Sequence, residues 1–585
     1  MLRFVFGRSG CGKSSFVFNE IKKLVESGEN NVILLTPEQY SLVAERRLLM
    51  DLGEDMVNCV DNSSFSRISN DVKKKYGCDT LPALSKGGKV ILMCKAIDNC
   101  KDKFQLFNKK LDSLNFVSSM IKIYDEMKSC NLDSFQINEL SKNIENDVLF
   151  KKLSDISLVM SSFEELINGK FNDSSNELNR IYNQIFDKNY FKDKYIFIDG
   201  FNGFVAQEYK LLELIISESK CVTITLCSDS YDSKDNFNLF AYVNNSAKII
   251  KKIADKSNVK TEIVKLQNNF RFNNDELKAV ESHFFENCNR ILDSNENIHI
   301  YASKNISDEC DYVSREIKSL LRNGYKASQI AVITRDLIKY LSELEYSFTK
   351  YEVPYFKDER QPINSQSLVV MIEFMLRCIN FSFKSDDVLS LAKTGLTDIS
   401  DEDINDIENY VFLWNINGLK WTKPFNNSTK GFVNELDESD KKALDKINET
   451  REKLIKPLVA FKSAAKSKDS REISEAIYNT LISYKADKKI KEYAIELDKN
   501  GFYTLANEQG RVWELIMNIL NQLATTLGET DLKTYAQMFS LIISSEDLGS
   551  VPSGIDNVQI GQADRIRTDN PKAVFVLGAN EGEFP

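Results

Sequence analysis

The first residues of the chain carry a pattern typical of phosphate binding. An apolar run over 2–6 leads into eight residues that match G-x-x-x-x-G-K-[ST] at every fixed position: Gly7, Arg8, Ser9, Gly10, Cys11, Gly12, Lys13 and Ser14. Glycines allow the backbone to wrap around phosphate oxygens, and the following helix points its positive N-terminus at them. In such a loop, Lys13 contacts the β- and γ-phosphates and Ser14 binds Mg²⁺. The alternative is a chance match in a glycine-containing turn, but the apolar run before the loop and the helical pattern after it favour an ATP site.

A second apolar run, over 195–198, ends in a carboxylate that could hold the same Mg²⁺. Asp199 occupies the position where nucleotide-hydrolysing proteins place a magnesium ligand, commonly beside a glutamate that polarises the attacking water. Here the next residue is Gly200, which has no side chain to serve as a base. Loss of a general base slows such chemistry about 10²–10⁴-fold. We therefore expect ATP to be bound and sensed but not used as fuel for movement; the alternative for Asp199 is a capping role at the strand end.

Apolar runs bounded by turn residues predict the strands that must position these groups. A first set predicts parallel strands of one α/β layer, over 2–6, 31–36, 195–200 and 221–227. A second α/β region is predicted by runs over 297–303, 330–336 and 573–578, the last as a buried strand. Apolar residues at three- and four-residue spacing predict mostly helical stretches over about 75–185 and 375–545. The predicted fold class is α/β, with two nucleotide-binding-type domains that each carry a helical insertion. Because a buried strand needs a covering element, we expect this chain to be the N-terminal part of a longer polypeptide.

The composition argues against several classes of protein. The chain has 585 residues, of which 42% are hydrophobic and 28% charged, so several globular domains are expected. The absence of an apolar run of 18 residues and of a leader-like segment argues against a membrane or secreted protein and predicts a cytoplasmic one. Eleven cysteines without a C-x-x-C pair, and only two histidines, His283 and His299, argue against a zinc site or a histidine-based triad. The net charge of −10 still leaves room for a local basic groove.

Several blocks together resemble the AddB/RexB family, the second subunits of bacterial AddAB helicase-nucleases and relatives of UvrD-like superfamily 1 helicases. They are the phosphate loop, "YIFIDGFNGF", "LQNNFRF" and the terminal "AVFVLGANEGEFP", with further family-like blocks over 34–49, 63–69, 324–336 and 351–363. The resemblance implies two RecA-like domains with parallel sheets, each with a mainly helical insertion. The implied first RecA-like domain (1A) covers 1–74 and 186–290, and its insertion (1B) covers 75–185. The implied second domain (2A), which is truncated, covers 291–374 and 546–585, and its insertion (2B) covers 375–545.

The resemblance also implies roles for residues of the motor motifs. Arg271 matches an arginine that contacts the γ-phosphate. The alternative interpretation is that Arg271 is a surface arginine near a turn. The terminal block resembles a motif that normally carries T-x-H-x-x-K-G, but the four fixed positions hold Gln562, Asp564, Arg567 and Thr568. Because the aspartate–glutamate pair is also lost at Gly200, the resemblance implies a degenerate motor that still binds ATP and Mg²⁺.

DNA contacts are implied by the block Ser64, Phe65, Ser66 and Arg67, which offers the hydroxyls, aromatic ring and cation that single strands need. Its alternative is an ordinary helix N-cap with Phe65 in the core. The segment 354–360 is a further candidate. The family implies an AddA-like helicase-nuclease partner in a heterodimer, DNA single strands and duplex ends as ligands, and recognition of the Chi sequence. It also implies a C-terminal nuclease domain with a 4Fe-4S cluster, and no block of that domain is found in these residues.

The resemblance thus implies the helicase-like part of a subunit that processes double-strand DNA ends for recombinational repair. The whole subunit resembles an ATP-dependent deoxyribonuclease, whereas this part is expected to have little ATPase or helicase activity alone. Two alternatives stay open. One is an active superfamily 1 helicase that takes its catalytic carboxylate from elsewhere, and the other is a P-loop phosphotransferase with no nucleic-acid role.

Overall fold

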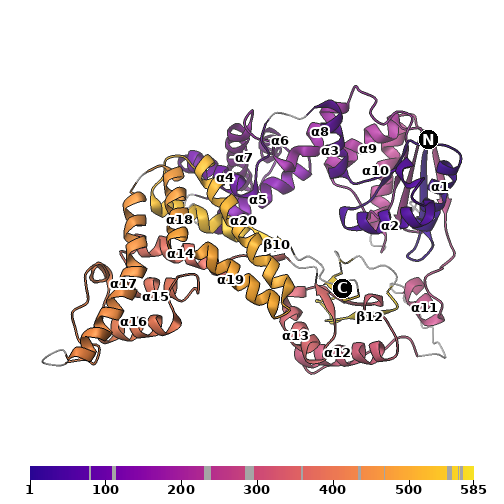
Figure 1. Cartoon of the computed structure of the whole chain (residues 1–585). Helices are drawn as coiled ribbons and strands as arrows, with labels where there is room; N and C mark the ends of the chain where they lie inside the picture. The colour runs from indigo at the N-terminus through magenta and orange to yellow at the C-terminus, as the bar shows by residue number, and fades with distance from the viewer. Residues whose placement is uncertain are drawn as a thin grey trace.

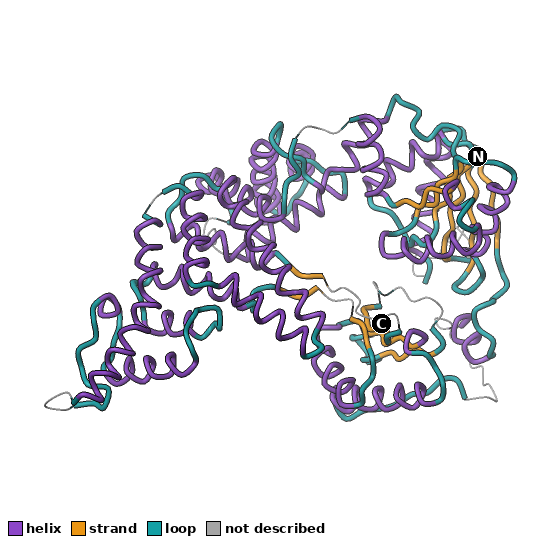
Figure 2. The backbone as a smooth tube through the Cα atoms, in the orientation of Figure 1, coloured by secondary structure: helices purple, strands orange, loops and turns teal. Residues whose placement is uncertain are grey.

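The computed structural model shows an α/β protein in which two separate parallel sheets are joined by a large helical region (Figure 1). It describes residues 1–77, 81–107, 114–229, 239–283, 296–357, 360–432, 437–466, 468–549, 556–563, 566 and 571–584. The strands gather in two places, one near the N-terminus and one near the C-terminus (Figure 2). No helix within the described ranges is both long and apolar enough to cross a membrane.

The first sheet has six parallel strands in the order β3-β2-β4-β5-β1-β6. They are β1 (Leu2–Gly7), β2 (Val32–Leu35), β3 (Val60–Ser63), β4 (Tyr195–Ile198), β5 (Cys221–Cys227) and β6 (Thr261–Lys265). The four predicted strands are confirmed as the inner ones: β2, β4, β5 and β1. The apolar pattern does not predict the edge strands β3 and β6, because their half-polar sequences, VDNS and TEIVK, contain no buried apolar run.

Helices cover both faces of this sheet. On one face lie α1 (Lys13–Glu26) and α2 (Ser41–Leu52), whose buried side chains meet those of β2 and β4. On the other face lie α3 (Phe65–Tyr76), α8 (Glu177–Ile185), α9 (Ala206–Glu218) and α10 (Ala241–Lys256). Because all strands are parallel, their carboxyl ends lie at one edge of the sheet. The loops that follow β1 and β4 therefore open at the same edge.

Two helical stretches, far apart in the sequence, share one hydrophobic core. The first contains α4 (Lys86–Cys100), α5 (Leu114–Ser129), α6 (Ser134–Ser141) and α7 (Asp147–Ile167). The second contains α14 (Ser367–Asn380), α15 (Ser385–Ala392), α16 (Asp401–Leu413), α17 (Glu438–Ala464), α18 (Ser470–Ser483), α19 (Ala486–Lys499), α20 (Tyr503–Thr526) and α21 (Leu532–Ser545). Their buried residues form one continuous cluster in which α4 contacts α20 and α21. The helical character of both stretches is confirmed, and their shared core is not evident from the sequence.

The second sheet has four parallel strands in the order β12-β7-β11-β8. They are β7 (Ile330–Thr334), β8 (Tyr355–Lys357), β11 (Val558–Gln562) and β12 (Ala573–Val576), and they share a core with α12 (Ile306–Arg322) and α13 (Leu337–Lys350). A short antiparallel pair, β9 (Arg360–Pro362) and β10 (Asp547–Gly549), lies beside the helical region. Helix α11 (Asp275–His283) lies below the first α/β unit and beside the second (Figure 1).

Two strand predictions in this second part are wrong. Residues 297–303 form neither strand nor helix, and Ile300 is 95% exposed. Strand β12 exists but is not buried, because it lies at the edge of the sheet and its side chains alternate in exposure. Val574 and Val576 are nearly half exposed, whereas Ala573 and Phe575 pack on the core. An apolar run alone does not tell whether both faces of a strand are covered.

Candidate nucleotide site

The phosphate loop connects a strand to a helix, as its pattern predicts. β1 ends at Gly7 and α1 begins at Lys13. Gly10 and Gly12 have φ angles of 83° and 79°, in the left-handed region that favours glycine. Gly10 is also tightly packed, because an added Cβ would lie 2.7 Å from the Cβ of Arg271. Backbone conformation therefore favours glycine at both positions, and close packing also requires it at Gly10.

Lys13 lies folded back over the loop that contains it. Its ammonium donates hydrogen bonds to the carbonyl oxygens of Gly7 and Arg8, each at 2.8 Å. Both acceptors are neutral, so the oxygens of a triphosphate would be stronger, charge-assisted partners. Ser14 follows in the first turn of α1, where the unpaired backbone N–H groups carry the partial positive charge of the helix. The loop thus presents the groups that a triphosphate requires.

Asp199 directly follows β4 and is 2% exposed. Thr225 on β5 donates a hydrogen bond from its hydroxyl to Oδ1 of Asp199. The other carboxylate oxygen, Oδ2, is buried and has no hydrogen-bond partner among the described residues. A buried carboxylate oxygen without a partner is costly, and a hard cation such as Mg²⁺ prefers oxygen ligands. The site therefore fits Mg²⁺, which Asp199 and the Ser14 hydroxyl would hold.

A bound nucleotide would complete such a metal site. Within the described ranges, no group of three or more His, Cys, Asp or Glu side chains is placed to hold a metal ion. Phosphate oxygens would therefore supply the remaining ligands, and the ion would neutralise charge on the β- and γ-phosphates. The hydroxyl of Thr36, directly after β2, is another fully buried polar group without a hydrogen-bond partner in the described part of the chain.

Gly200 has a backbone reason to be glycine. Its φ angle is 83°, and an added Cβ would lie 3.4 Å from Cδ of Pro37. Side chains larger than hydrogen are strained in this conformation, at a cost of about 1–3 kcal/mol. The backbone after Asp199 thus disfavours the glutamate that a hydrolysing motor carries there.

The segment that contains Arg271 lies directly against the phosphate loop. The backbone N–H of Phe270 donates to the Gly10 carbonyl at 2.9 Å, and Nη1 of Arg271 donates to the Ser9 hydroxyl at 2.9 Å. Asn269 fixes the local turn, because its Oδ1 accepts the backbone N–H of Arg271 at 3.0 Å. The structure thus brings this predicted residue to the loop across 262 positions of sequence.

Two polar side chains of the site, Thr225 and Asp229, are not marked by any motif in the sequence. The guanidinium of Arg8 makes a two-pronged ion pair with Asp229, at 2.8 Å from Nε to Oδ1 and 2.9 Å from Nη2 to Oδ2. Asp229 comes to the phosphate loop because β5 pairs with β1, and Thr225 comes to Asp199 because β5 also pairs with β4. Pairing between strands more than 200 residues apart is set by the fold, so no local pattern marks these residues.

The predicted DNA-contact block begins α3. Ser64 caps the helix by accepting the backbone N–H of Arg67 at 3.3 Å. Phe65 is 6% exposed, and its ring lies 5.7 Å from that of Phe201 and 6.2 Å from that of Phe204. Ser64 and Phe65 therefore have the roles given by the structural alternative, a helix cap and a core residue. Phe65 is not placed to stack on a base.

The other two residues of this block are exposed but already bonded. The Ser66 hydroxyl donates to Glu38, and Nη1 of Arg67 lies 2.8 Å from Oε1 of Glu45. Arg67 also donates to the Asn62 carbonyl at 3.2 Å. Both side chains stay DNA-contact candidates, since a phosphate would replace a carboxylate with another anionic acceptor.

The remaining predicted positions lie partly outside the described residues. Gln562 is the last residue of β11. Asp564, Arg567 and Thr568 are not among the described residues, and neither are residues 358–359 of the segment 354–360.

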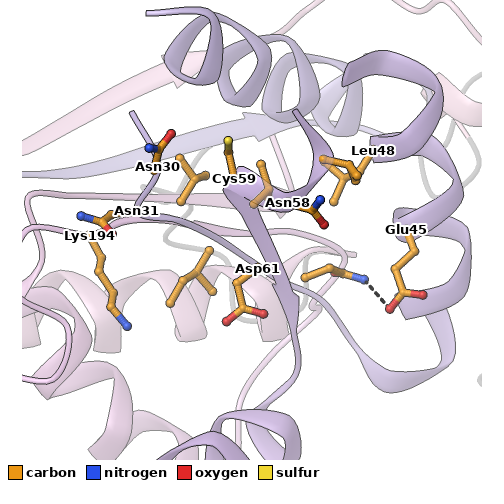
Figure 3. A pocket seen from close by; sticks show the side chains of 13 residues that line it. Asn30, Asn31, Glu45, Leu48, Asn58, Cys59, Asp61 and Lys194 are labelled. Carbon is orange, nitrogen blue, oxygen red and sulfur yellow. Dashed lines mark hydrogen bonds between the residues drawn. The ribbon is translucent and has the colours of Figure 1, made fainter. Parts of the chain in front are cut away.

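A pocket of about 530 Å³ lies elsewhere on the first α/β unit (Figure 3). It is lined by the beginnings of β2 and β3 and by residues of α2, with Asp61 and Lys194 on one side of β3 and Glu45 and Asn58 on the other. None of its lining residues belongs to the phosphate loop, and the loop opens at the carboxyl ends of the strands. This pocket is therefore not the nucleotide site.

Comparisons with known proteins agree with the architecture. Residues 4–281 match the family model described as "ADDB, N-terminal", and residues 260–543 match that of the UvrD-like helicase C-terminal domain. The second match fits the superfamily 1 fold, which confirms the predicted fold class.

Curated relatives match along the whole chain, and each is named as the B subunit of an ATP-dependent helicase/deoxyribonuclease. The proteins of Clostridium novyi, Caldanaerobacter subterraneus subsp. tengcongensis and Clostridium tetani are 30%, 31% and 31% identical over 100% of this chain. The matches cover 51%, 52% and 53% of those proteins, so the chain spans about half the length of these relatives. The family models and the relatives together show that the chain belongs to the AddB family.

Proposed function

We propose that the chain binds ATP and Mg²⁺ at the loop between β1 and α1, and that it is the helicase-like part of an AddB-type subunit of an ATP-dependent helicase and exonuclease. One observation carries the proposal. A complete phosphate loop and a buried aspartate, one of whose carboxylate oxygens has no partner among the described residues, open at the same edge of one sheet. The full subunit would act with an AddA-like partner on double-strand DNA ends in recombinational repair. Nuclease activity would belong to the whole subunit, since the chain spans about half of its relatives.

The proposed site binds ATP without hydrolysing it efficiently. Gly200 follows the magnesium ligand and supplies no base, and its positive φ disfavours a larger residue there. Lys13, Ser14 and Arg271 would hold the triphosphate. ATP would therefore stabilise one arrangement of the chain rather than drive stepping along DNA.

We propose the same division into domains as the resemblance implies: 1A over 1–74 and 186–290, 1B over 75–185, 2A over 291–374 and 546–585, and 2B over 375–545. The strands of the first sheet support 1A, and the cluster shared by α4, α20 and α21 supports contact between 1B and 2B. Helix α8 packs on the first sheet, although it falls within the range of 1B.

Single-stranded DNA would pass along the carboxyl edge of the sheets, with Ser66 and Arg67 as candidate contacts. A motor that does not step is free to vary the side chains that line this path, and base-specific contacts can develop there. On this ground we propose that the path serves recognition of the Chi sequence.

The experiment that tests the proposal measures ATP binding and single-strand DNA binding by the 585-residue chain. Lys13→Ala should weaken ATP binding at least about tenfold, because a charged hydrogen bond contributes about 1.5–3 kcal/mol. Lys22→Ala is the matched control, since Lys22 is a half-exposed lysine on the same helix. DNA affinity should fall steeply with salt, as counterion release requires. Absence of ATP binding would refute the proposal, and ATP binding without any DNA binding would favour a phosphotransferase.

A further inference from the structure

Helix α11 is bound at its C-terminal end by the phosphate loop. Nη1 of Arg8 donates hydrogen bonds to the carbonyl oxygens of Glu281 and Ser282, at 3.1 Å and 2.8 Å. The same guanidinium holds both carboxylate oxygens of Asp229. A backbone carbonyl oxygen accepts a strong, charge-assisted hydrogen bond from a guanidinium, so an arginine is a suitable partner for these two carbonyls. One side chain of the phosphate loop thus fixes the end of α11.

The other end of α11 is bound to the start of the second α/β unit. Glu276, in the first turn, is 4% exposed. Its Oε1 accepts the backbone N–H of Glu296 at 3.0 Å, and its Oε2 accepts that of Asn297 at 2.8 Å. These residues precede α12 and the second sheet in the chain. In Figure 1, α11 correspondingly lies below the first α/β unit and beside the second.

The bonds of Lys13 connect this helix to nucleotide binding. Its ammonium now bonds the carbonyl oxygens of Gly7 and Arg8 at 2.8 Å. When this ammonium turns toward phosphate and gives up its bond to Arg8, the Arg8 carbonyl keeps only the bond from the Cys11 N–H, at 3.3 Å, among the bonds described here. A triphosphate in the loop also competes with Asp229 for the Arg8 guanidinium, because both are anions. Both effects act on the residue that holds α11.

We propose that Arg8 and α11 form a relay that carries the state of the nucleotide site to the second α/β unit, through Glu276 and the backbone at 296–297. The inference rests on the proposed function, because it requires ATP to bind at the phosphate loop. Arg8 and Glu276 act in it as positioning residues. Through this relay, ATP can act on the chain without being hydrolysed. Binding alone changes the hydrogen bonds through which α11 connects the two α/β units.

The test is amide hydrogen exchange, followed by mass spectrometry, on the 585-residue chain with and without saturating ATP and Mg²⁺. In the wild type, ATP should change the exchange rates of peptides covering 275–283 and 296–303 by about fivefold or more, the lower end of common coupling strengths. Arg8→Ala should lose both changes at ATP concentrations that still saturate the site. Glu276→Gln should keep the change in 275–283 and lose the change in 296–303. Arg3→Ala is the matched control, because Arg3 lies on β1 and pairs with Glu20 and Glu262.

ATP affinity, measured for every variant in the same samples, separates two kinds of failure. If the wild type binds no ATP, the proposed function fails and the relay fails with it. If the wild type binds ATP but neither peptide responds, the relay alone is refuted. It is also refuted if Arg8→Ala, saturated with ATP and folded by thermal melting, responds like the wild type. The response of Glu276→Gln tests the second half of the relay without altering the phosphate loop.

Discussion

The nucleotide site depends on individual atoms that the protein leaves available. Asp199 uses one carboxylate oxygen to accept the Thr225 hydroxyl and keeps the other without a partner in the described chain. Lys13 donates hydrogen bonds to neutral carbonyl oxygens, which charged phosphate oxygens can replace as acceptors. Both residues would therefore gain their strongest partners from a bound metal–nucleotide complex.

Replacing Asp199 should separate metal-dependent binding from folding. In Asp199→Asn, the amide oxygen can still accept the Thr225 hydroxyl, so the chain should keep its melting temperature. The charge that holds Mg²⁺ is lost, and the Mg²⁺-dependent part of ATP affinity should fall by about tenfold or more. Titration of ATP with Mg²⁺ and with EDTA measures this difference. Equal affinities in the variant and the wild type would remove Asp199 from the site.

Cys11, inside the phosphate loop, should be alkylated slowly. It is 5% exposed, and burial raises the pKa of its thiol above the ordinary value, against the opposing effect of Lys13. A raised pKa leaves less thiolate at neutral pH, so alkylation stays slow until the pH rises toward that pKa. With N-ethylmaleimide at pH 7.5, Cys11 should react more than about tenfold slower than the exposed Cys130. Mass spectrometry of the labelled peptides measures both rates, and similar rates would contradict this placement of Cys11.

At the scale of elements, the beginning of α3 shows how a motif-like block can serve packing. Phe65→Ala should lower the free energy of unfolding by about 3–5 kcal/mol, because the ring contacts Phe201 and Phe204 in the core. Ser64→Ala should cost about 1 kcal/mol through loss of the helix cap. Chemical denaturation measures both values. A Phe65 variant of normal stability that loses DNA binding would instead place the ring in the DNA path.

The elements that carry the site are the ones that the sequence predicts well. Strands β1 and β4 are apolar runs buried on both faces, and the loop after β1 has a pattern with fixed spacing. Edge strands lack that signal: β3 reads VDNS, and 297–303 looks like a strand but is exposed and unpaired. Thr225 and Asp229 have no local signal, because the pairing of β5 with β4 brings Thr225 to Asp199 and the pairing of β5 with β1 brings Asp229 to the loop.

At the scale of the whole molecule, the two helical stretches behave as one packed body. Gly87 on α4 allows their close approach, because an added Cβ would lie 3.0 Å from Cγ2 of Ile542 and would also meet Oε1 of Gln522. This contact joins α4 to both α20 and α21. The first α/β unit is thereby linked to the second through the helical region as well as through α11.

Overfilling this contact should destabilise the helical region. Gly87→Val should lower the free energy of unfolding by about 1–3 kcal/mol, the usual cost of overpacking. Gly510→Val is the control, because Gly510 lies on exposed surface of α20 with no neighbour within 4 Å of an added Cβ. Both variants place the same side chain in a helix, so their difference reports packing. If denaturant unfolding gave the same loss in free energy of unfolding for both variants, α4 and α20 would not be in close contact.

The central claim is that the chain holds ATP without an effective base to hydrolyse it. Gly200→Glu is a poor test, because its positive φ and the nearby Pro37 would strain the added side chain. The direct measurement is steady-state ATP hydrolysis by the wild type and by Lys13→Ala, at saturating ATP, with and without single-stranded DNA. We predict that the wild type binds ATP but shows little turnover, and that DNA does not stimulate it. Strong DNA-stimulated hydrolysis that Lys13→Ala abolishes would contradict the account and would identify an active motor.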